Sequence, residues 1–270
     1  MRPGRWDLAL VIPSPIDRMS GGSYFGVKKA CEQLHVQYSY DDQSIVVVNS
    51  QYRAFPSLKV TAKVYNLDMK EKFSKEVDLG VGPDSSTRVF TLPELQGLSS
   101  TYFVSLELRA TGQVESRNFY WLSTHPETLD WSRQEEDTSG EYDISTWTPN
   151  KDFADYTALN ALPRVDLDAS ARYTQNGHEG STTVSVRNPS SSVAFAIHLK
   201  VNRTSDERVS REAPVDNEIL PVLWQDNYFA LLPGETREVT ATYAIDEKNT
   251  RIPKVEIEGW NVNPRTITSE

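Results

Sequence analysis

The chain has 270 residues, a formal net charge of -10 and a sequence pI near 5.0, and 38% of its residues are hydrophobic. The acidic balance argues against nucleic acid or an anionic membrane surface as the main partner, because both would repel the chain. With 6 Trp, 12 Tyr and 9 Phe the chain can bury real cores, which excludes wholesale disorder. No apolar run approaches the roughly 20 residues that a membrane-spanning helix needs, and the single cysteine, Cys31, excludes an internal disulfide.

The N-terminal part of the sequence predicts one short helix. Residues 1–19 show neither helical nor strand periodicity, and their short apolar centre ends at Pro13 without a convincing signal-peptide cleavage site. After the Gly21-Gly22 pair, a helix is expected over residues 22–34, with one apolar stripe on its surface. That stripe consists of Tyr24, Val27, Cys31 and Leu34.

From Leu34 the hydrophobic period changes to two, and predicted strands recur about every 10 to 15 residues, a spacing typical of a sandwich. We expect about seven strands in residues 34–124 and therefore one immunoglobulin-like domain. The clearest segments are Ser44–Asn49, Leu58–Tyr65, Phe73–Leu79, Arg88–Leu92, Tyr102–Arg109 and Val114–Leu122.

A second β block is predicted for residues 163–270. Alternation is clear in Val165–Tyr173, Ser181–Arg187 and Val193–Val201, where Phe195 and Ile197 are expected on the core face and His198 on the polar face. The fold class is therefore all-β, with two immunoglobulin-like β-sandwiches in tandem preceded by one short helix.

Residues 125–162 interrupt the strand pattern between the two sandwiches. They contain the acidic run Glu135-Glu136-Asp137 together with Trp131, Trp147, Phe153 and Tyr156. Because a purely flexible linker would not hold four large aromatic residues, we interpret this segment as an ordered connector packed on a neighbouring domain.

Few residues indicate chemistry. His35, His125, His178 and His198 have no ligand-like spacing, and the sequence lacks a Gly-rich phosphate loop, a nucleophile elbow and an HExxH motif. Asp41-Asp42 and the acidic run are adjacent carboxylates, whereas glycoside hydrolysis needs two carboxylates opposed across a pocket. We therefore assign no catalytic, cofactor-binding or metal-binding residue.

Four aromatic residues are candidates for contact with sugar, because an aromatic face can pack on the apolar C–H face of a pyranose. They are Trp131, Trp147, Tyr228 and Phe229. Packing between domains would use the same residues, and we favour that interpretation. The triplet Asn202-Arg203-Thr204 fits the N-glycosylation pattern and hints at a secretory origin.

Several stretches resemble family 2 glycoside hydrolases, and specifically their exo-β-D-glucosaminidase branch. The resemblance covers roughly residues 20–263. The matching stretches are residues 21–38, Tyr120-Trp121-Leu122-Ser123 with Leu129-Asp130-Trp131, residues 153–163, and Leu223-Trp224-Gln225-Asp226-Asn227-Tyr228-Phe229 continuing to Glu235.

This resemblance implies a multi-domain, extracellular, retaining hydrolase that releases glucosamine from chitosan oligomers, with both catalytic glutamates on a (β/α)₈ barrel. The helix over residues 22–33 would then be the last helix of that barrel, and we expect the barrel to precede this chain and to be its partner. Residues 1–19 do not resemble the barrel, and residues 132–145 look longer and more acidic than the family pattern.

Three functional interpretations follow, and a further one, a self-sufficient enzyme, is disfavoured because the sequence offers no pair of opposed carboxylates. In the first, the chain is the non-catalytic C-terminal β-sandwich region of such an enzyme. In the second, it is a binding module that acts alone on chitosan or a related polysaccharide. In the third, it is the same region of a β-mannosidase-type enzyme, because these relatives share the accessory domains.

Overall fold

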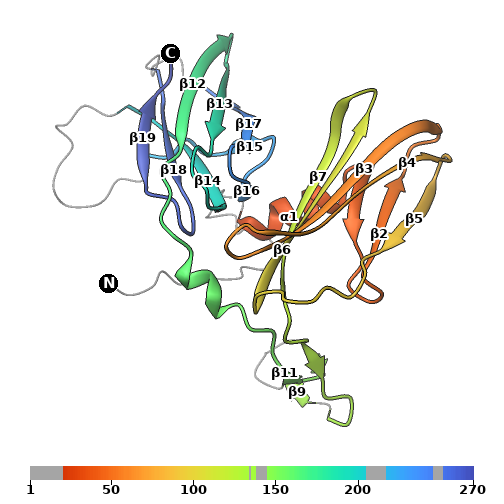
Figure 1. Cartoon of the computed structure of the whole chain (residues 1–270). Helices are drawn as coiled ribbons and strands as arrows, with labels where there is room; N and C mark the ends of the chain where they lie inside the picture. The colour runs from red at the N-terminus through yellow and green to blue at the C-terminus, as the bar shows by residue number, and fades with distance from the viewer. Residues whose placement is uncertain (1–20, 134, 138–144, 205–216, 246–251) are drawn as a thin grey trace. The chain divides into compact units, whose positions relative to one another are not determined.

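The computed structural model describes residues 21–133, 135–137, 145–204, 217–245 and 252–270, which form two compact units (Figure 1). One unit is Gln33–Leu162, which we call sandwich 1. The other joins the described residues 21–32 to Pro163–Glu270, and we call it sandwich 2. Residues 1–19, for which the sequence predicts no regular element, lie outside the described residues.

Sandwich 1 consists of two antiparallel sheets that share one core. The three-stranded sheet has the order β1 (Leu34–Tyr38), β2 (Ser44–Asn49) and β5 (Ser85–Thr91). The four-stranded sheet has the order β4 (Glu71–Val81), β3 (Phe55–Asn66), β6 (Thr101–Ala110) and β7 (Gln113–Ser123).

The alternating strands of sandwich 1 bury one face each. In the register of β3 and β6, Val60 lies opposite Leu108 and Val64 opposite Val104, and all four side chains are fully buried. They share a cluster with residues of the other sheet, Val36, Ile45 and Val47 among them. The period-two pattern therefore directs the apolar side chains of both sheets into the space between them.

The connector forms short local elements. β8 (Thr128–Leu129) pairs with β11 (Asn150–Asp152), β9 (Glu135–Asp137) pairs with β10 (Ser145–Trp147), and a 3₁₀ helix, η1, spans Thr157–Ala161. Gln134 and residues 138–144, which include part of the long acidic stretch, lie outside the described residues.

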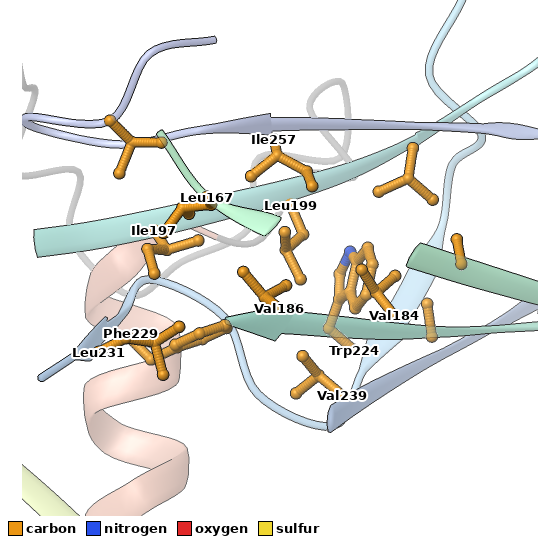
Figure 2. Close-up of a cluster of buried hydrophobic side chains, with 14 of the residues drawn as sticks. Leu167, Val184, Val186, Ile197, Leu199, Trp224, Phe229, Leu231, Val239 and Ile257 are labelled. Atoms are coloured by element: carbon orange, nitrogen blue, oxygen red, sulfur yellow. The ribbon is translucent and has the colours of Figure 1, made fainter. Parts of the chain in front are cut away.

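Sandwich 2 also pairs two antiparallel sheets, here of four strands each. The first has the order β12 (Asp168–Asn176), β13 (Glu179–Arg187), β17 (Thr236–Ala244) and β15 (Val222–Trp224). The second has the order β16 (Phe229–Leu231), β14 (Ala194–Asn202), β18 (Lys254–Glu258) and β19 (Arg265–Thr268). Figure 2 shows Val184, Val186 and Val239 of the first sheet facing Leu199 and Ile257 of the second.

The start of β14 differs from the predicted alternation. Ala194, rather than Phe195, joins the core cluster with Ile197 and Leu199. The cause is a bulge between Ala194 and Ile197, where Ala196 adopts a φ of 52°. The buried side chain of Asn261 holds this bulge, because its Oδ1 accepts a hydrogen bond from the Phe195 backbone N–H at 2.9 Å. One extra residue in a strand moves later side chains to the opposite face.

The helix α1 spans Gly22–Ala30 and is shorter than predicted. Cys31 follows it as C-cap, and Leu34 belongs to β1, where it is buried in sandwich 1. The prediction of a helix to residue 34 was wrong because Leu34 fits both the helical stripe and the period of the following strand. The all-β fold of two sandwiches preceded by one short helix is confirmed.

Candidate functional site

The most elaborate side-chain arrangement in sandwich 2 is the seat of helix α1. The buried residue of the helix is Phe25, which is 6% exposed and belongs to the core cluster of sandwich 2. Its ring lies 5.9 Å from that of Tyr228, centroid to centroid, and 5.1 Å from that of Tyr24. One aromatic side chain therefore anchors the helix in the core of sandwich 2.

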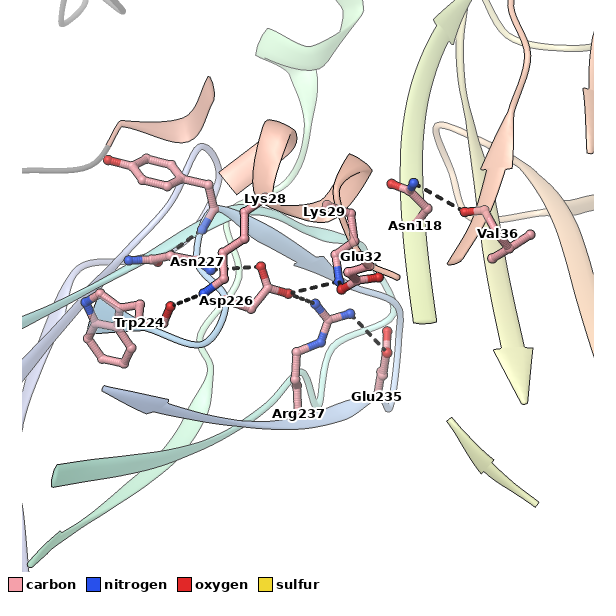
Figure 3. Close-up of polar contacts among 11 residues, drawn as sticks. Lys28, Lys29, Glu32, Val36, Asn118, Trp224, Asp226, Asn227, Glu235 and Arg237 are labelled. Atoms are coloured by element: carbon pink, nitrogen blue, oxygen red, sulfur yellow. Dashed lines mark hydrogen bonds and ion pairs between the residues drawn. The ribbon is translucent and has the colours of Figure 1, made fainter. Parts of the chain in front are cut away.

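Polar contacts fix the orientation of the helix (Figure 3). Lys28 Nζ donates a hydrogen bond of 2.7 Å to the backbone carbonyl of Trp224. Lys29 lies 2.7 Å from Glu32 and 4.0 Å from Asp226, measured from Nζ to the nearest carboxylate oxygen. Both lysines lie in the last turn of the helix, where positive charge is favourable.

Asp226 extends this ion pairing into the sandwich. Its Oδ2 lies 3.2 Å from Arg237, whose guanidinium lies 3.8 Å from Glu235 and 4.7 Å from the centre of the Phe229 ring. Figure 3 shows the resulting series of alternating charges, which begins on the helix and ends on sandwich 2. We call these contacts, with Phe25 and Tyr228, the helix seat.

Tyr228 connects the helix seat to a second group of polar residues. Its ring stacks on His198 with the centroids 4.3 Å apart, and His198 Nδ1 lies 2.9 Å from Glu258. Lys200 Nζ lies 2.7 Å from the same carboxylate. Tyr228 adopts a φ of 55°, which is unfavourable for a residue with a large side chain, and Asn227 Oδ1 accepts its backbone N–H at 3.0 Å.

Burial decides the direction of the pKa shift for His198 and Tyr228, and hydrogen bonding decides it for Glu258. Burial lowers the pKa of His198, although the hydrogen bond to Glu258 opposes this effect. Burial also acts to raise the pKa of Glu258, but hydrogen bonds from Lys200 and His198 outweigh it and lower that pKa. Burial raises the pKa of Tyr228 to about 12. At neutral pH the group therefore combines a neutral imidazole, a neutral phenol and an ion pair.

The four sugar-contacting candidates fall in different places. Phe229 is 6% exposed in the core of sandwich 2, so its ring serves packing, and Tyr228 is half-buried between His198 and the helix. Trp131, which follows β8, is 80% exposed among the described residues. Trp147 is the last residue of β10, and its side chain is not among those that the structure describes.

His198, predicted on the polar face of its strand, is more buried than that prediction implies. His198 does point away from the core cluster, but it is 8% exposed because Tyr228 and Glu258 cover it. Asn202, in the glycosylation triplet, is half-buried and donates a hydrogen bond of 3.0 Å to Glu256.

Sequence reasoning missed the side of the helix that is buried. The predicted stripe is the exposed one, since Tyr24 is 38% and Val27 46% exposed and Cys31 is exposed as well. At 100° per residue, Phe25 and Lys29 lie 100° and 140° from Tyr24 around the helix axis, whereas Lys28 lies only 40° from Tyr24 and reaches Trp224 from beside the exposed stripe. The available signal was Phe25 itself, a large apolar residue outside the stripe.

The described residues lack two kinds of feature. Within them, no group of three or more His, Cys, Asp and Glu side chains is arranged to hold a metal ion. The described part of the chain likewise contains no helix that is long and apolar enough to cross a membrane.

Comparison with known proteins matches both sandwiches. Residues 145–262 match the family model of the exo-beta-D-glucosaminidase Ig-fold domain, and residues 41–125 match that of the mannosidase Ig/CBM-like domain. The exo-beta-D-glucosaminidase of Streptomyces avermitilis is 39% identical over 92% of this chain and 26% of its own length. A mannosylglycoprotein endo-beta-mannosidase of Lilium longiflorum is 27% identical over 88% of this chain and 28% of its own length.

A solved structure agrees with these matches. The crystal structure of the Amycolatopsis orientalis exo-chitosanase CsxA superimposes with a TM-score of 0.81 and 35% identity, covering 93% of this chain and 28% of that one. The chain thus spans about a quarter of the length of the curated relatives it matches. It belongs to the exo-β-D-glucosaminidase family of glycoside hydrolases and corresponds to the C-terminal region of two immunoglobulin-like sandwiches in these enzymes.

Proposed function

We propose that this chain serves as the accessory β-sandwich region of an exo-β-D-glucosaminidase and supports a catalytic domain that releases glucosamine from chitosan. The observation that favours this role is the two-sided helix α1. Its buried side is fixed to sandwich 2 by Phe25, while Tyr24 and Val27 lie about 100° and 160° from Phe25 around the helix axis and expose apolar area. The extracellular location expected for the family is part of this proposal.

The exposed side of α1 is suited to contact with a catalytic domain. Neighbouring apolar side chains that remain exposed on an ordered helix often mark an interaction surface. The helix seat keeps this surface in a fixed orientation on sandwich 2. We expect the catalytic domain to pack on Tyr24 and Val27 and to cover Cys31.

A domain exchange tests this function. The corresponding region of the Amycolatopsis orientalis relative is replaced by this chain, and glucosamine release from chitosan oligosaccharides is measured. We expect the chimera to be active and Val27→Asp to reduce its activity and thermal stability by disrupting the contact. Ile252→Asp is the matched control, because Ile252 is also 46% exposed but is not part of the helix.

An inactive chimera that is nevertheless folded would contradict the proposal, as would equal effects of the two aspartate substitutions. The second candidate, a β-mannosidase-type enzyme, is favoured only by the match of residues 41–125 and by the Lilium relative. Transfer of this chain into that relative, with release of mannose-containing product as the assay, distinguishes the two. We expect activity to be retained only in the glucosaminidase chimera.

A further inference from the structure

Five tyrosines lie near one another in sandwich 1: three are in ring contact, and Tyr102 and Tyr156 are close enough to act electrostatically on Tyr38 and Tyr40, respectively. Tyr38 ends β1, Tyr40 follows it, Tyr102 and Tyr120 lie on the paired strands β6 and β7, and Tyr156 directly precedes η1. The Tyr38 ring lies 5.3 Å from that of Tyr40 and 5.7 Å from that of Tyr120, and Tyr40 lies 6.0 Å from Tyr120. We call these five residues the tyrosine cluster.

The side chains of the tyrosine cluster range from buried to largely exposed. Tyr38 is 7% exposed and belongs to the core, Tyr102 and Tyr120 are half-buried against it, and Tyr40 is 69% exposed. Tyr40 stands nearly perpendicular to both Tyr38 and Tyr120, at 81° and 78°. The rings of Tyr38 and Tyr120 therefore pack against the Tyr40 ring, while much of the Tyr40 surface faces solvent.

The other exposed member is fixed by the connector. The backbone N–H of Asp155 donates to Ser123 Oγ at 3.1 Å, and the buried Thr101 hydroxyl donates to the Asp155 carbonyl at 3.1 Å. These two bonds hold the residue next to Tyr156 on the ends of β6 and β7. Tyr156 is 37% exposed, so the cluster has two accessible rings on an ordered base.

The chemistry of the cluster suits a sugar with hydroxyl and ammonium groups. Burial raises the pKa of Tyr38 and Tyr120 to about 12, and burial, followed by the Glu127 charge, raises that of Tyr156. The phenols therefore remain hydrogen-bond donors at neutral pH. Aromatic faces supply apolar contact for the C–H groups of a pyranose.

Two carboxylates lie beside the cluster, Asp155 next to Tyr156 and Asp42 near Tyr38, and Asp42 also forms an ion pair with Arg88. Hydrogen bonds from Thr157 lower the pKa of Asp155, and those from Ser44 lower that of Asp42, so both carboxylates are ionised. In the sequence, residues 33–162 contain 19 Asp and Glu against 11 Lys and Arg, which leaves -8 of the total -10 on this unit. A ligand with regularly spaced positive charges would be attracted to such a surface.

We propose that the tyrosine cluster is a binding site for a chain of β-linked glucosamine units, with Tyr40 and Tyr156 as the stacking residues. This inference rests on the proposed function, because that function supplies the chemical class of the ligand. The site differs from the aromatic residues selected from the sequence. Trp131 and Phe153 are more exposed than Tyr156, but no ring contact supports them among the described residues.

Calorimetric titration of the full chain with glucosamine hexamer tests the site. We expect binding that weakens by about tenfold in Tyr40→Ala and in Tyr156→Ala, each of which removes one stacking ring. Tyr52→Ala is the matched control, since Tyr52 is 93% exposed in the same unit and has no place in the cluster. Circular dichroism confirms that each variant is folded, and Trp131→Ala should bind like the parent chain.

The neutral N-acetylglucosamine hexamer tests the contribution of charge. We expect it to bind more weakly than the glucosamine hexamer, and we expect the difference to shrink at high salt. The inference is overturned if the parent chain does not bind, if the two hexamers bind equally, or if Tyr40→Ala and Tyr156→Ala bind like Tyr52→Ala. An active chimera with no binding here would reject this inference alone, whereas intact binding with an inactive chimera would reject the proposed function alone.

Discussion

The two sandwiches share an architecture but differ in what their surfaces hold. Sandwich 2 fixes a helix through Phe25, Lys28 and the ion pairs of Asp226. Sandwich 1 contains most of the net negative charge and presents Tyr40 and Tyr156 in the tyrosine cluster. The comparison shows that the core alternation determines the fold, while the side chains outside the core differ between the two copies of that fold.

The largest expected effects on stability come from truncating one buried leucine in the core of each sandwich. Leu106 in sandwich 1 and Leu199 in sandwich 2 are both fully buried, and truncation to alanine removes packed area and leaves a cavity. Each substitution should lower the free energy of unfolding of its own sandwich by about 2–5 kcal/mol. Thermal unfolding followed by calorimetry would show which transition moves.

The control for this pair is Leu223→Ala, because Leu223 is 68% exposed and its truncation should change stability by less than about 0.5 kcal/mol. Equal displacement of both transitions by Leu199→Ala would contradict the view that each sandwich has its own core.

Buried asparagines provide the next comparison. Asn227 in sandwich 2 bonds both backbone groups of Leu199, accepting from its N–H and donating to its carbonyl at 2.9 Å each. Asn49 in sandwich 1 donates to the carbonyls of Arg53 and Gly82. Because Leu199 is fully buried and Arg53 and Gly82 are exposed, Asn227→Ala should cost about 2–3 kcal/mol and Asn49→Ala about 1 kcal/mol.

Denaturant unfolding of the two variants would measure this difference. Asn227→Asp, which keeps the acceptor but sets a buried carboxylate oxygen against the Leu199 carbonyl, should cost at least as much as Asn227→Ala. A larger loss for Asn49→Ala than for Asn227→Ala would show that exposure of the backbone partner does not decide the cost.

The sequence allowed prediction of the strands but not of the helix seat. Period-two alternation in segments such as residues 58–65 identified the strands, because burial of one face is a local property of the pattern. The sequence-based prediction failed where a contact between residues far apart in the sequence decides the structure. Asn261 reverses the alternation at Phe195, and Tyr228 and Trp224, far along the chain, determine that Phe25 is the buried residue of the helix.

A pH dependence should distinguish sandwich 2 from sandwich 1. Because burial lowers the pKa of His198, the unfolded chain binds the proton more readily than the folded one. The stability gained from neutral His198 is therefore complete above its unfolded pKa near 6.5 and is lost as pH falls toward its lower folded pKa. We expect the unfolding transition of sandwich 2 to move to lower temperature between pH 7 and pH 5.

His198→Gln, which does not titrate, should reduce this slope. Glu258 has a lowered pKa and loses its contribution only below pH 4.5, so measurements above pH 5 keep the two groups apart. The same pH slope in the parent and in His198→Gln would show that another group is responsible.

The smallest expected effect concerns the ion pair between the helix and sandwich 2. Lys29 is 23% exposed and lies 4.0 Å from Asp226, so Lys29→Met should cost only about 0.2–1 kcal/mol. Asp226 keeps Arg237 at 3.2 Å in this variant, which leaves no buried charge without a partner.

Phe25→Ala, by contrast, removes the only helix residue in the core cluster. Hydrogen exchange of the α1 amides should therefore rise strongly in Phe25→Ala and slightly in Lys29→Met, and high salt should remove only the smaller difference. The reverse order would mean that the ion pairs hold the helix and that Phe25 merely fills space beneath it.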